Sequence, residues 1–324
     1  MAEGQKKILG MDQTEMSIFM RRYGITLVML LMIAVLSLAS PAFRTPDNVL
    51  NVLLQVSING ILSIGMVFVM IAGGIDISIG SMLALTSSVA GMVLLKTGSI
   101  PLALGVSIAA TTVAGCMNGL LVAKCKMFPF VVTLATQLVF RGFGYFVSGG
   151  YAHSIEEPAF KVIGTGRFFD VIPYPVILFF LVVLAAYILL HWTKTGRYVY
   201  AVGGNINAAT ASGVNVSKTL ILTYVLSGIC CGIAGIIMTS RINASQPNIG
   251  IGYETDAIAA CVIGGASFAG GLGTIPGTVV GIIIIGLIYN GMNLLGVSSY
   301  WQTMMKGLLI VAAVMLDLLL HKKK

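Results

Sequence analysis

The sequence predicts an all-α polytopic membrane protein with about ten transmembrane helices and both termini in the cytoplasm. Three observations lead to this fold class. The 324 residues are 57% hydrophobic and 9% charged, with a mean hydropathy of +0.98, whereas soluble domains carry roughly 25% charged residues. Apolar runs of about 20 residues, enough to cross a bilayer, repeat along the chain. Most of the 19 Lys and Arg residues lie at the ends of these runs, where basic residues orient the spans.

The predicted spans follow one another with short connections. They lie at roughly 25–40, 49–72, 81–95, 102–123, 128–147, 174–190, 219–239, 255 into a glycine cluster at 264–273, 277–289 and 300–320. Basic side chains gather in 1–23, at 124–126, in 191–218 and in 321–324, which all fall on one side, so that side is the cytoplasm. We therefore expect a cytoplasmic tail over 1–23, one transmembrane domain over 24–320 and a basic cytoplasmic end over 321–324.

Several function classes are excluded by what the sequence lacks. It contains no Gly-x-x-x-x-Gly-Lys-Ser/Thr loop, so we do not expect this chain to bind ATP itself, and it contains no His-Glu-x-x-His zinc motif. The 5 cysteines include no Cys-x-x-Cys pair, which argues against a disulfide or metal framework. The net charge of +8 belongs to span ends rather than to a basic patch for nucleic acid. We expect a chain that is not an enzyme, holds no metal or cofactor of its own, and contacts membrane lipid.

The polar interruption at 191–218 carries the signals of a short helix. Asn205 suits a helix N-cap, the Ala-rich stretch 206–212 suits about two helical turns, and Gly213 lies where a helix favours a left-handed stop. Gly203 and Gly204 would end the element before it. The loop is either a simple connector or a surface that a soluble partner grips in the cytoplasm.

Two glycine-bearing breaks recur at matching places and suggest an internal repeat. The first contains Gly73 and Gly74, and the second contains Gly264 and Gly265. Broken backbone at membrane depth often lines a solute path. The alternative is a tight turn between helices that pack as a hairpin.

A few polar residues lie within or next to the predicted spans. Asp76 and Ser78 follow the first break, and either they take part in gating or solute binding or one of them caps the next helix. Arg141 and Lys306 each lie about two turns from an outer span end. They either face a wet path and bind a polyhydroxylated solute, or they snorkel or pair structurally. Asn59, in the second predicted span, is a further pathway candidate.

Four stretches together resemble the membrane permease subunits of bacterial sugar ABC importers, in the ribose-type branch. They are Ala72-Gly-Gly-Ile-Asp-Ile-Ser-Ile-Gly-Ser81, Gly196-Arg-Tyr-Val-Tyr-Ala-Val-Gly-Gly-Asn205, Gly252-Tyr-Glu-Thr-Asp-Ala-Ile-Ala-Ala260 and Asn290-Gly-Met-Asn-Leu-Leu-Gly-Val-Ser-Ser-Tyr300. The resemblance covers roughly residues 20–320. It implies a multi-pass protein of the bacterial plasma (inner) membrane that imports a sugar of the ribose, galactose or xylose class. Related permeases also carry allose, inositol and quorum-signal sugars.

The resemblance also implies partners and a coupling surface. A second permease copy or a paralogue would complete the pathway, a cytoplasmic ABC ATPase would bind ATP and Mg, and a periplasmic or surface-tethered binding protein would deliver the sugar to outer loops such as 149–173. The coupling helix of the family maps onto Gly203, Gly204, Asn205, Ala208, Ala209 and Gly213, with Arg197 beside it. Energy would therefore enter through the coupling loop 191–218.

Two other hypotheses stay open at this point. The chain could be a stand-alone secondary sugar carrier, driven by an ion gradient with Asp76 as its cation site. It could also be a membrane scaffold without transport, although this leaves the glycine breaks and the intramembrane charges without a role.

Overall fold

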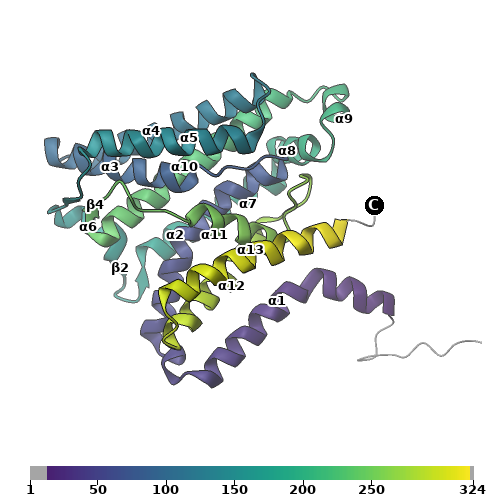
Figure 1. Cartoon of the computed structure of the whole chain (residues 1–324), viewed down its shortest axis with the longest axis horizontal. Helices are drawn as coiled ribbons and strands as arrows, with labels where there is room; N and C mark the ends of the chain where they lie inside the picture. Colours follow the sequence, from purple (N-terminus) through teal and green to yellow (C-terminus); the bar gives the residue numbers. More distant parts are fainter. Residues whose placement is uncertain (1–12, 322–324) are drawn as a thin grey trace, which may run out of the picture.

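The computed structural model describes residues 13–321, and most of them are helical (Figure 1). The helices before the central loop are α1 (Gln13–Ala39), the short 3-10 helix η1 (Pro41–Arg44), α2 (Pro46–Ile71), α3 (Ile79–Thr97), α4 (Ile100–Ala123), α5 (Pro129–Ser148), α6 (Pro158–Thr165) and α7 (Tyr174–Trp192). After them come α8 (Lys194–Gly204), α9 (Ile206–Ala211), α10 (Val216–Ile242), α11 (Tyr253–Ile263), α12 (Ile275–Leu294) and α13 (Ser299–His321). The tail residues 1–12 and the last three lysines lie outside the described part.

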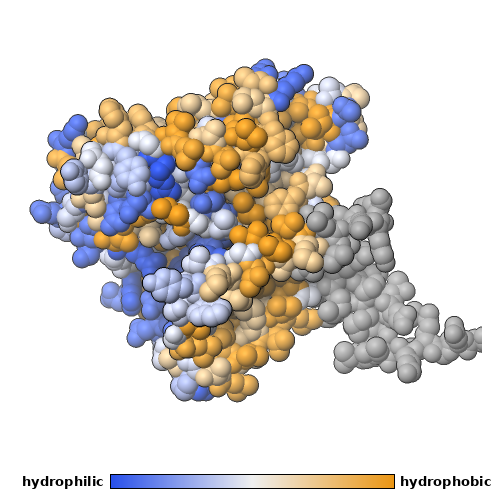
Figure 2. Space-filling model, viewed as in Figure 1, coloured by the Kyte–Doolittle hydropathy of each residue, from blue (hydrophilic) through white to orange (hydrophobic). Residues whose placement is uncertain are grey.

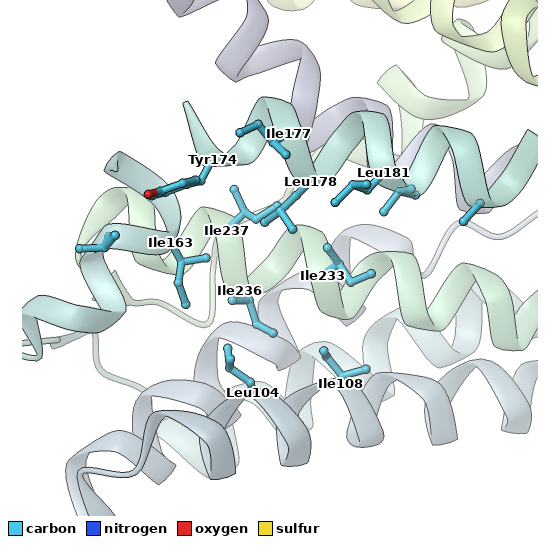
Figure 3. A pocket seen from close by; sticks show the side chains of 13 residues that line it. Leu104, Ile108, Ile163, Tyr174, Ile177, Leu178, Leu181, Ile233, Ile236 and Ile237 are labelled. Atoms are coloured by element: carbon cyan, nitrogen blue, oxygen red, sulfur yellow. The ribbon is translucent and has the colours of Figure 1, made fainter. Parts of the chain in front are cut away.

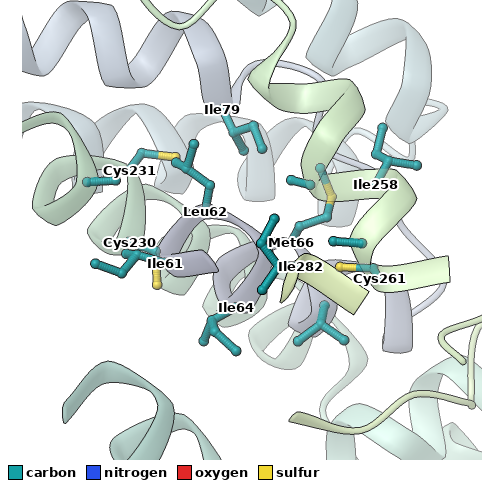
Figure 4. Close-up of a cluster of buried hydrophobic side chains, with 14 of the residues drawn as sticks. Ile61, Leu62, Ile64, Met66, Ile79, Cys230, Cys231, Ile258, Cys261 and Ile282 are labelled. Carbon is teal, nitrogen blue, oxygen red and sulfur yellow. The ribbon is translucent and has the colours of Figure 1, made fainter. Parts of the chain in front are cut away.

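The core is built around α2 and α3. In the most apolar 18-residue stretch of each helix, 83% of the residues of α2 and 78% of those of α3 are buried. The corresponding share is 28% for α4, α5 and α7. This difference places α2 and α3 inside the bundle and the other three at its perimeter. Figure 4 shows Leu62 and Met66 of α2 among side chains of α3, α10, α11 and α12, including Cys231 and Cys261. All five cysteines are free thiols.

Glycine lets α4 and α10 approach each other closely. A Cβ atom at Gly115 of α4 would overlap the carbonyl oxygen of Tyr224, and one at Gly228 of α10 would overlap that of Thr111. Close backbone approach of this kind is a common way for helices to associate in lipid, where burial of apolar surface gives little driving force.

The elements outside the bundle gather at its two ends. At one end α6 lies with two small antiparallel pairs, in which β1 (His153–Ser154) pairs with β4 (Ala244–Ser245) and β2 (Arg167–Phe168) pairs with β3 (Ile172–Pro173). At the other end lie α8 and α9, near the start of α1 and the end of α13 (Figure 1). This separation agrees with the predicted alternation between outer and cytoplasmic segments.

Within residues 13–321, seven helices are long and apolar enough to cross a membrane: α2, α3, α4, α5, α7, α10 and α12. α1 adds the shorter apolar stretch Gly24–Ala39. Orange apolar surface covers much of the face in Figure 2. The chain is therefore a multi-pass membrane protein, while the count of ten spans stays a prediction.

The predicted eighth span is wrong as a continuous helix. α11 has 11 residues, about 17 Å at 1.5 Å per residue, or roughly half of the hydrocarbon thickness. Before it, strand β4 is followed by irregular chain and turns over 246–252, with left-handed φ at Gly250 and Gly252. This segment contacts α3: Ser245 packs on Gly91, the Gln246 N–H donates to Ser87, and Gly250 meets Gly80. The irregular segment and the short helix together replace the span.

Candidate transport and coupling site

The central loop folds as predicted into a capped helix at the surface. The Asn205 side-chain oxygen accepts the backbone N–H of Ala208 at 3.0 Å, which caps α9, and Gly213 follows its end with a φ of 79°. Ala209 is buried and holds α9 to the bundle, while Arg197, Asn205 and Ala208 are exposed. The loop therefore presents a capped helix at the surface.

The end of α8 meets both glycine breaks in one place. The Gly271 N–H donates to the carbonyl oxygen of Ile71 at 2.8 Å. A Cβ at Gly203 would overlap that oxygen and lie 2.6 Å from the Gly271 nitrogen. A Cβ at Gly270 would lie 2.8 Å from the Gly73 Cα. We call this contact of three backbone segments the glycine junction.

Two further details define the junction. The Tyr200 hydroxyl donates to the carbonyl oxygen of Gly273 at 2.7 Å, and burial raises the pKa of this phenol, so that it stays a donor. Gly204, in contrast, would carry a Cβ with nothing within 4 Å. The sequence singled out Gly203 and Gly204 together. The backbone of each lies close to Gly271, but only Gly203 would carry a Cβ into the contact.

The two breaks share the same local geometry. In the first, the Gly73 N–H donates to Met70 and the Gly74 N–H to Val69, both at 2.9 Å. In the second, the Gly265 N–H donates to Val262 and the Ala266 N–H to Cys261, again at 2.9 Å. Both are Schellman ends, with φ of 82° at Gly73 and 90° at Gly265. Gly264 takes the place of Ala72 in this comparison. Because the ends of α5, α9 and α12 show the same pair of bonds, the internal repeat stays a prediction.

Asp76 lies at the centre of a buried polar cluster. Its Oδ1 accepts the Ser78 N–H at 3.1 Å and the Ser78 hydroxyl at 2.6 Å, and its Oδ2 accepts the Ser227 hydroxyl at 2.9 Å. The Asn118 amide donates to the Ser78 oxygen at 2.9 Å. The carboxyl group is fully buried, and these bonds tie the start of α3 to α4 and α10. Protein donors occupy both carboxylate oxygens, which does not fit an open cation site, and the N-cap residue of α3, Ser78, makes no side-chain cap bond.

Arg141 binds the irregular segment before α11. Its Nη1 donates to the carbonyl oxygens of Pro247 at 3.0 Å and Ile249 at 2.6 Å. Irregular backbone at membrane depth needs such partners, because lipid offers none. Of the two alternatives for Arg141, the structure contains the pairing within the protein.

Lys306 and Asn59 meet at Asp256 of α11. The Lys306 Nζ lies 3.1 Å from the Asp256 Oδ2, and the Tyr289 hydroxyl donates to Oδ1 at 2.7 Å. The Asn59 amide lies at 3.5 Å from Oδ2, and the Lys306 Nζ also stands 4.6 Å from the centre of the Tyr289 ring. Four helices, α2, α11, α12 and α13, thus meet in what we call the Asp256 cluster.

Sequence reasoning missed three members of these sites, Glu254, Asp256 and Tyr289. The available signal was two acids in an apolar stretch, both buried in the structure. The Glu254 Oε1 accepts the Gly252 N–H at 3.2 Å, while its buried Oε2 has no hydrogen-bond partner within residues 13–321. Among these residues no cluster of His, Cys, Asp and Glu could hold a metal ion.

Two cavities lie near these elements and differ in character. A groove of about 730 Å³ between α4, α7 and α10 is lined by apolar side chains and Tyr174 (Figure 3), which suits lipid rather than a polyhydroxylated solute. A cavity of about 700 Å³ lies beneath α9, between the first break and the start of α10, with Lys126, Thr210 and Asn215 in its lining. α9 therefore has space on the side that faces the bundle.

Known proteins resemble the chain over nearly its whole length. The ribose import permease protein of Bacillus subtilis (strain 168) is 44% identical over 301 residues, 92% of this chain and 93% of that protein. The ribose import permease protein of Escherichia coli (strain K12) is 42% identical, over 90% of this chain and 92% of its own. The D-allose transport system permease protein of Escherichia coli (strain K12) is 37% identical, over 94% of each.

No solved structure matches the chain. A family model described as branched-chain amino acid transport system / permease component matches residues 48–314. Because this match and the permease relatives both cover most of the sequence, the chain belongs to the family of the branched-chain amino acid transport system / permease component.

Proposed function

We propose that the chain is the transmembrane permease subunit of an ATP-driven importer of a monosaccharide, with ribose as the first candidate. The observation that carries this proposal is the 44% and 42% identity to two ribose import permeases over at least nine-tenths of each chain. The family description mentions branched-chain amino acids, but relatives that cover the chain end to end carry the names of ribose, allose and L-arabinose transport. Ring hydroxyl groups are the feature common to these three solutes.

We expect the two ends of the bundle to bind different partners. With α8, α9 and both termini in the cytoplasm, an ABC ATPase that binds ATP and Mg would grip α9, and a sugar-binding protein would dock at the end that holds α6 and the small strand pairs. A second permease copy or a paralogue would complete the path. This chain itself would make or break no bond in the sugar.

The glycine junction gives the coupling a physical route. α8 touches the end of α2 and the loop between α11 and α12 through backbone atoms, so that a displacement of α8 would reach both breaks without passing through flexible side chains. The cavity beneath α9 leaves room for that displacement. Alternating access would follow when nucleotide-driven closure of the ATPase moves α8 and α9 and rocks the two repeats.

The test is purification from the native membrane in a mild detergent, identification of the partners by mass, and reconstitution into proteoliposomes. We expect uptake of labelled ribose that needs ATP, a P-loop ATPase and a sugar-binding protein. D-allose and L-arabinose as competitors would rank the solutes.

The secondary-carrier hypothesis predicts a different result. A chain that purifies alone and carries ribose under a proton or sodium gradient would refute the importer and return Asp76 to the centre of the mechanism. Asp76→Asn distinguishes the two further. In an importer it should lower stability but leave the ATP requirement unchanged, since the Asp76 oxygens bind structural hydroxyls.

A further inference from the structure

The irregular segment 246–252 is exposed at a depth where lipid does not tolerate such backbone. It descends along α3 between β4 and α11, and Arg141 and Lys306, which flank it, each lie seven residues from the outer ends of α5 and α13, about 10 Å along a helix. Asn248 is nevertheless exposed, and Ile251 is 71% exposed. Irregular backbone at membrane depth is found only where it is buried in protein or lines a water-filled cavity.

The neighbours of this segment are also polar and partly open. The Lys306 side chain is 30% exposed although it pairs with Asp256, and Arg141 is half-buried while it holds the carbonyl groups of Pro247 and Ile249. In Figure 1 the segment lies between the layer that holds α3 and α5 and the layer that holds α13. Figure 2, from the same direction, shows blue and white surface between orange areas there. This face cannot be a lipid face, because ionisable and amide groups in membranes face protein or water.

We propose that this face, formed by 246–252 with Arg141 and Lys306, is the wall of the sugar path, with a second permease copy on its far side. The proposal rests on the proposed function and assigns a solute site within it. The exposed Asn248 amide offers one acceptor and two donors, the pattern that neighbouring sugar hydroxyls need. Arg141 keeps the wall in place by binding the two carbonyl groups on either side of Asn248. The buried Oε2 of Glu254, which has no hydrogen-bond partner in the described part of the chain, lies just behind the wall.

The wall also explains why α11 is short. A continuous helix would use its backbone groups internally and present only side chains, whereas the turns over 247–252 leave carbonyl groups free for Arg141. Pro247 and Gly250 are buried, while Asn248 and Ile251, each one residue further along, are exposed. This arrangement resembles in physical terms the broken helices that form solute sites near the midplane of other transporters.

Thiol accessibility in the full complex, with its ATPase and binding protein in membrane vesicles, tests the proposal. The background is Cys116→Ala/Cys125→Ser, which leaves the three buried cysteines in place. Asn248→Cys is compared with Val139→Cys. Val139 is 59% exposed on α5, two residues before Arg141 and so on the opposite side of the helix at nearly the same depth. We expect a membrane-impermeant thiosulfonate to modify the Asn248→Cys thiol at least tenfold faster than the Val139→Cys thiol, and ribose to slow the reaction during ATP turnover.

The possible outcomes separate the hypotheses. Equal rates at the two positions, or reaction of Asn248→Cys only with a lipid-soluble maleimide, would refute the proposal that this face is the wall of the sugar path.

Asn248→Leu tests the same proposal by transport, without cysteine chemistry. It should lower ribose uptake at least fivefold while ATP hydrolysis and complex assembly persist, and undiminished uptake would overturn the assignment of Asn248. A wild-type complex that needs no ATP for uptake would refute the importer, but the accessibility comparison would still decide whether the face is wet.

Discussion

Removal of Lys306 from the Asp256 cluster gives the sharpest test of the structure. Lys306→Met keeps the length of the side chain but leaves Asp256, which is 3% exposed, with the Tyr289 hydroxyl at 2.7 Å and the distant Asn59 amide. Breaking a buried ion pair costs about 3–5 kcal/mol and breaking an exposed one about 0–1 kcal/mol. Because the Lys306 side chain is 30% exposed, we expect a loss of about 2–3 kcal/mol.

The opposite substitution should cost less, and this asymmetry is the test. Asp256→Asn leaves Lys306 without its partner, but a lysine that is 30% exposed reaches water with its ammonium group, so the expected loss is about 1 kcal/mol. The neutral amide still accepts the Tyr289 hydroxyl. The double variant Lys306→Met/Asp256→Asn buries no charge and should therefore be more stable than Lys306→Met alone.

Thermal unfolding of the purified chain in one detergent measures these differences. At about 2–4 °C per kcal/mol for chains of 150–250 residues, Lys306→Met should lower the Tm by roughly 5 °C and the double variant should recover about half. A double variant no more stable than Lys306→Met, or an Asp256→Asn loss larger than that of Lys306→Met, would refute the reasoning.

Three further predictions follow from backbone geometry. Gly203→Ala should lower ribose uptake per ATP hydrolysed at least fivefold more than Gly204→Ala, measured in proteoliposomes, because only the Cβ at 203 would meet Ile71 and Gly271. Equal effects would contradict the glycine junction. Gly228→Ala should lower the Tm by several degrees, because its Cβ meets a backbone carbonyl of α4, whereas Gly105→Ala, with nothing within 4 Å, should leave it unchanged or slightly higher. Asn205→Ala removes the α9 cap at about 1 kcal/mol, and we expect weaker recovery of the ATPase in co-purification, which Asn205→Asp should restore.

Much of the helical frame could be predicted from the sequence. The hydropathy runs lie within a few residues of α2, α4, α5, α7, α10 and α13, because apolar length is set by the membrane and the ends are marked by Gly, Pro and basic residues. The cap at Asn205 and the stop at Gly213 are local signals, so they too could be read directly. The repeat of the two breaks was visible as glycine pairs.

The eighth span could not be predicted in the same way. Hydropathy reports that residues 253–263 are apolar, but it does not report that 246–252 is non-helical. That shape depends on α3 and on Arg141, which lies 106 residues away from Pro247 in the sequence. The Asp256 cluster has the same origin. Its partners Tyr289 and Lys306 lie 33 and 50 residues further along, and no spacing within α11 points to them.

The Asp76 cluster has a consequence for the order in which the protein is made. Ser227, which binds the Asp76 Oδ2, is 151 residues downstream, so α3 is synthesised well before α10 exists. A buried carboxyl group without that hydroxyl is costly in lipid. The first half of the chain therefore contains an acid that lacks one hydrogen-bond partner until α10 has been synthesised. In the same way, Asp256 lacks its ion-pair partner until Lys306 on the last helix has been synthesised. A chain whose synthesis stops early therefore contains buried acids without their partners. This difference distinguishes it from the finished protein for a membrane quality-control protease.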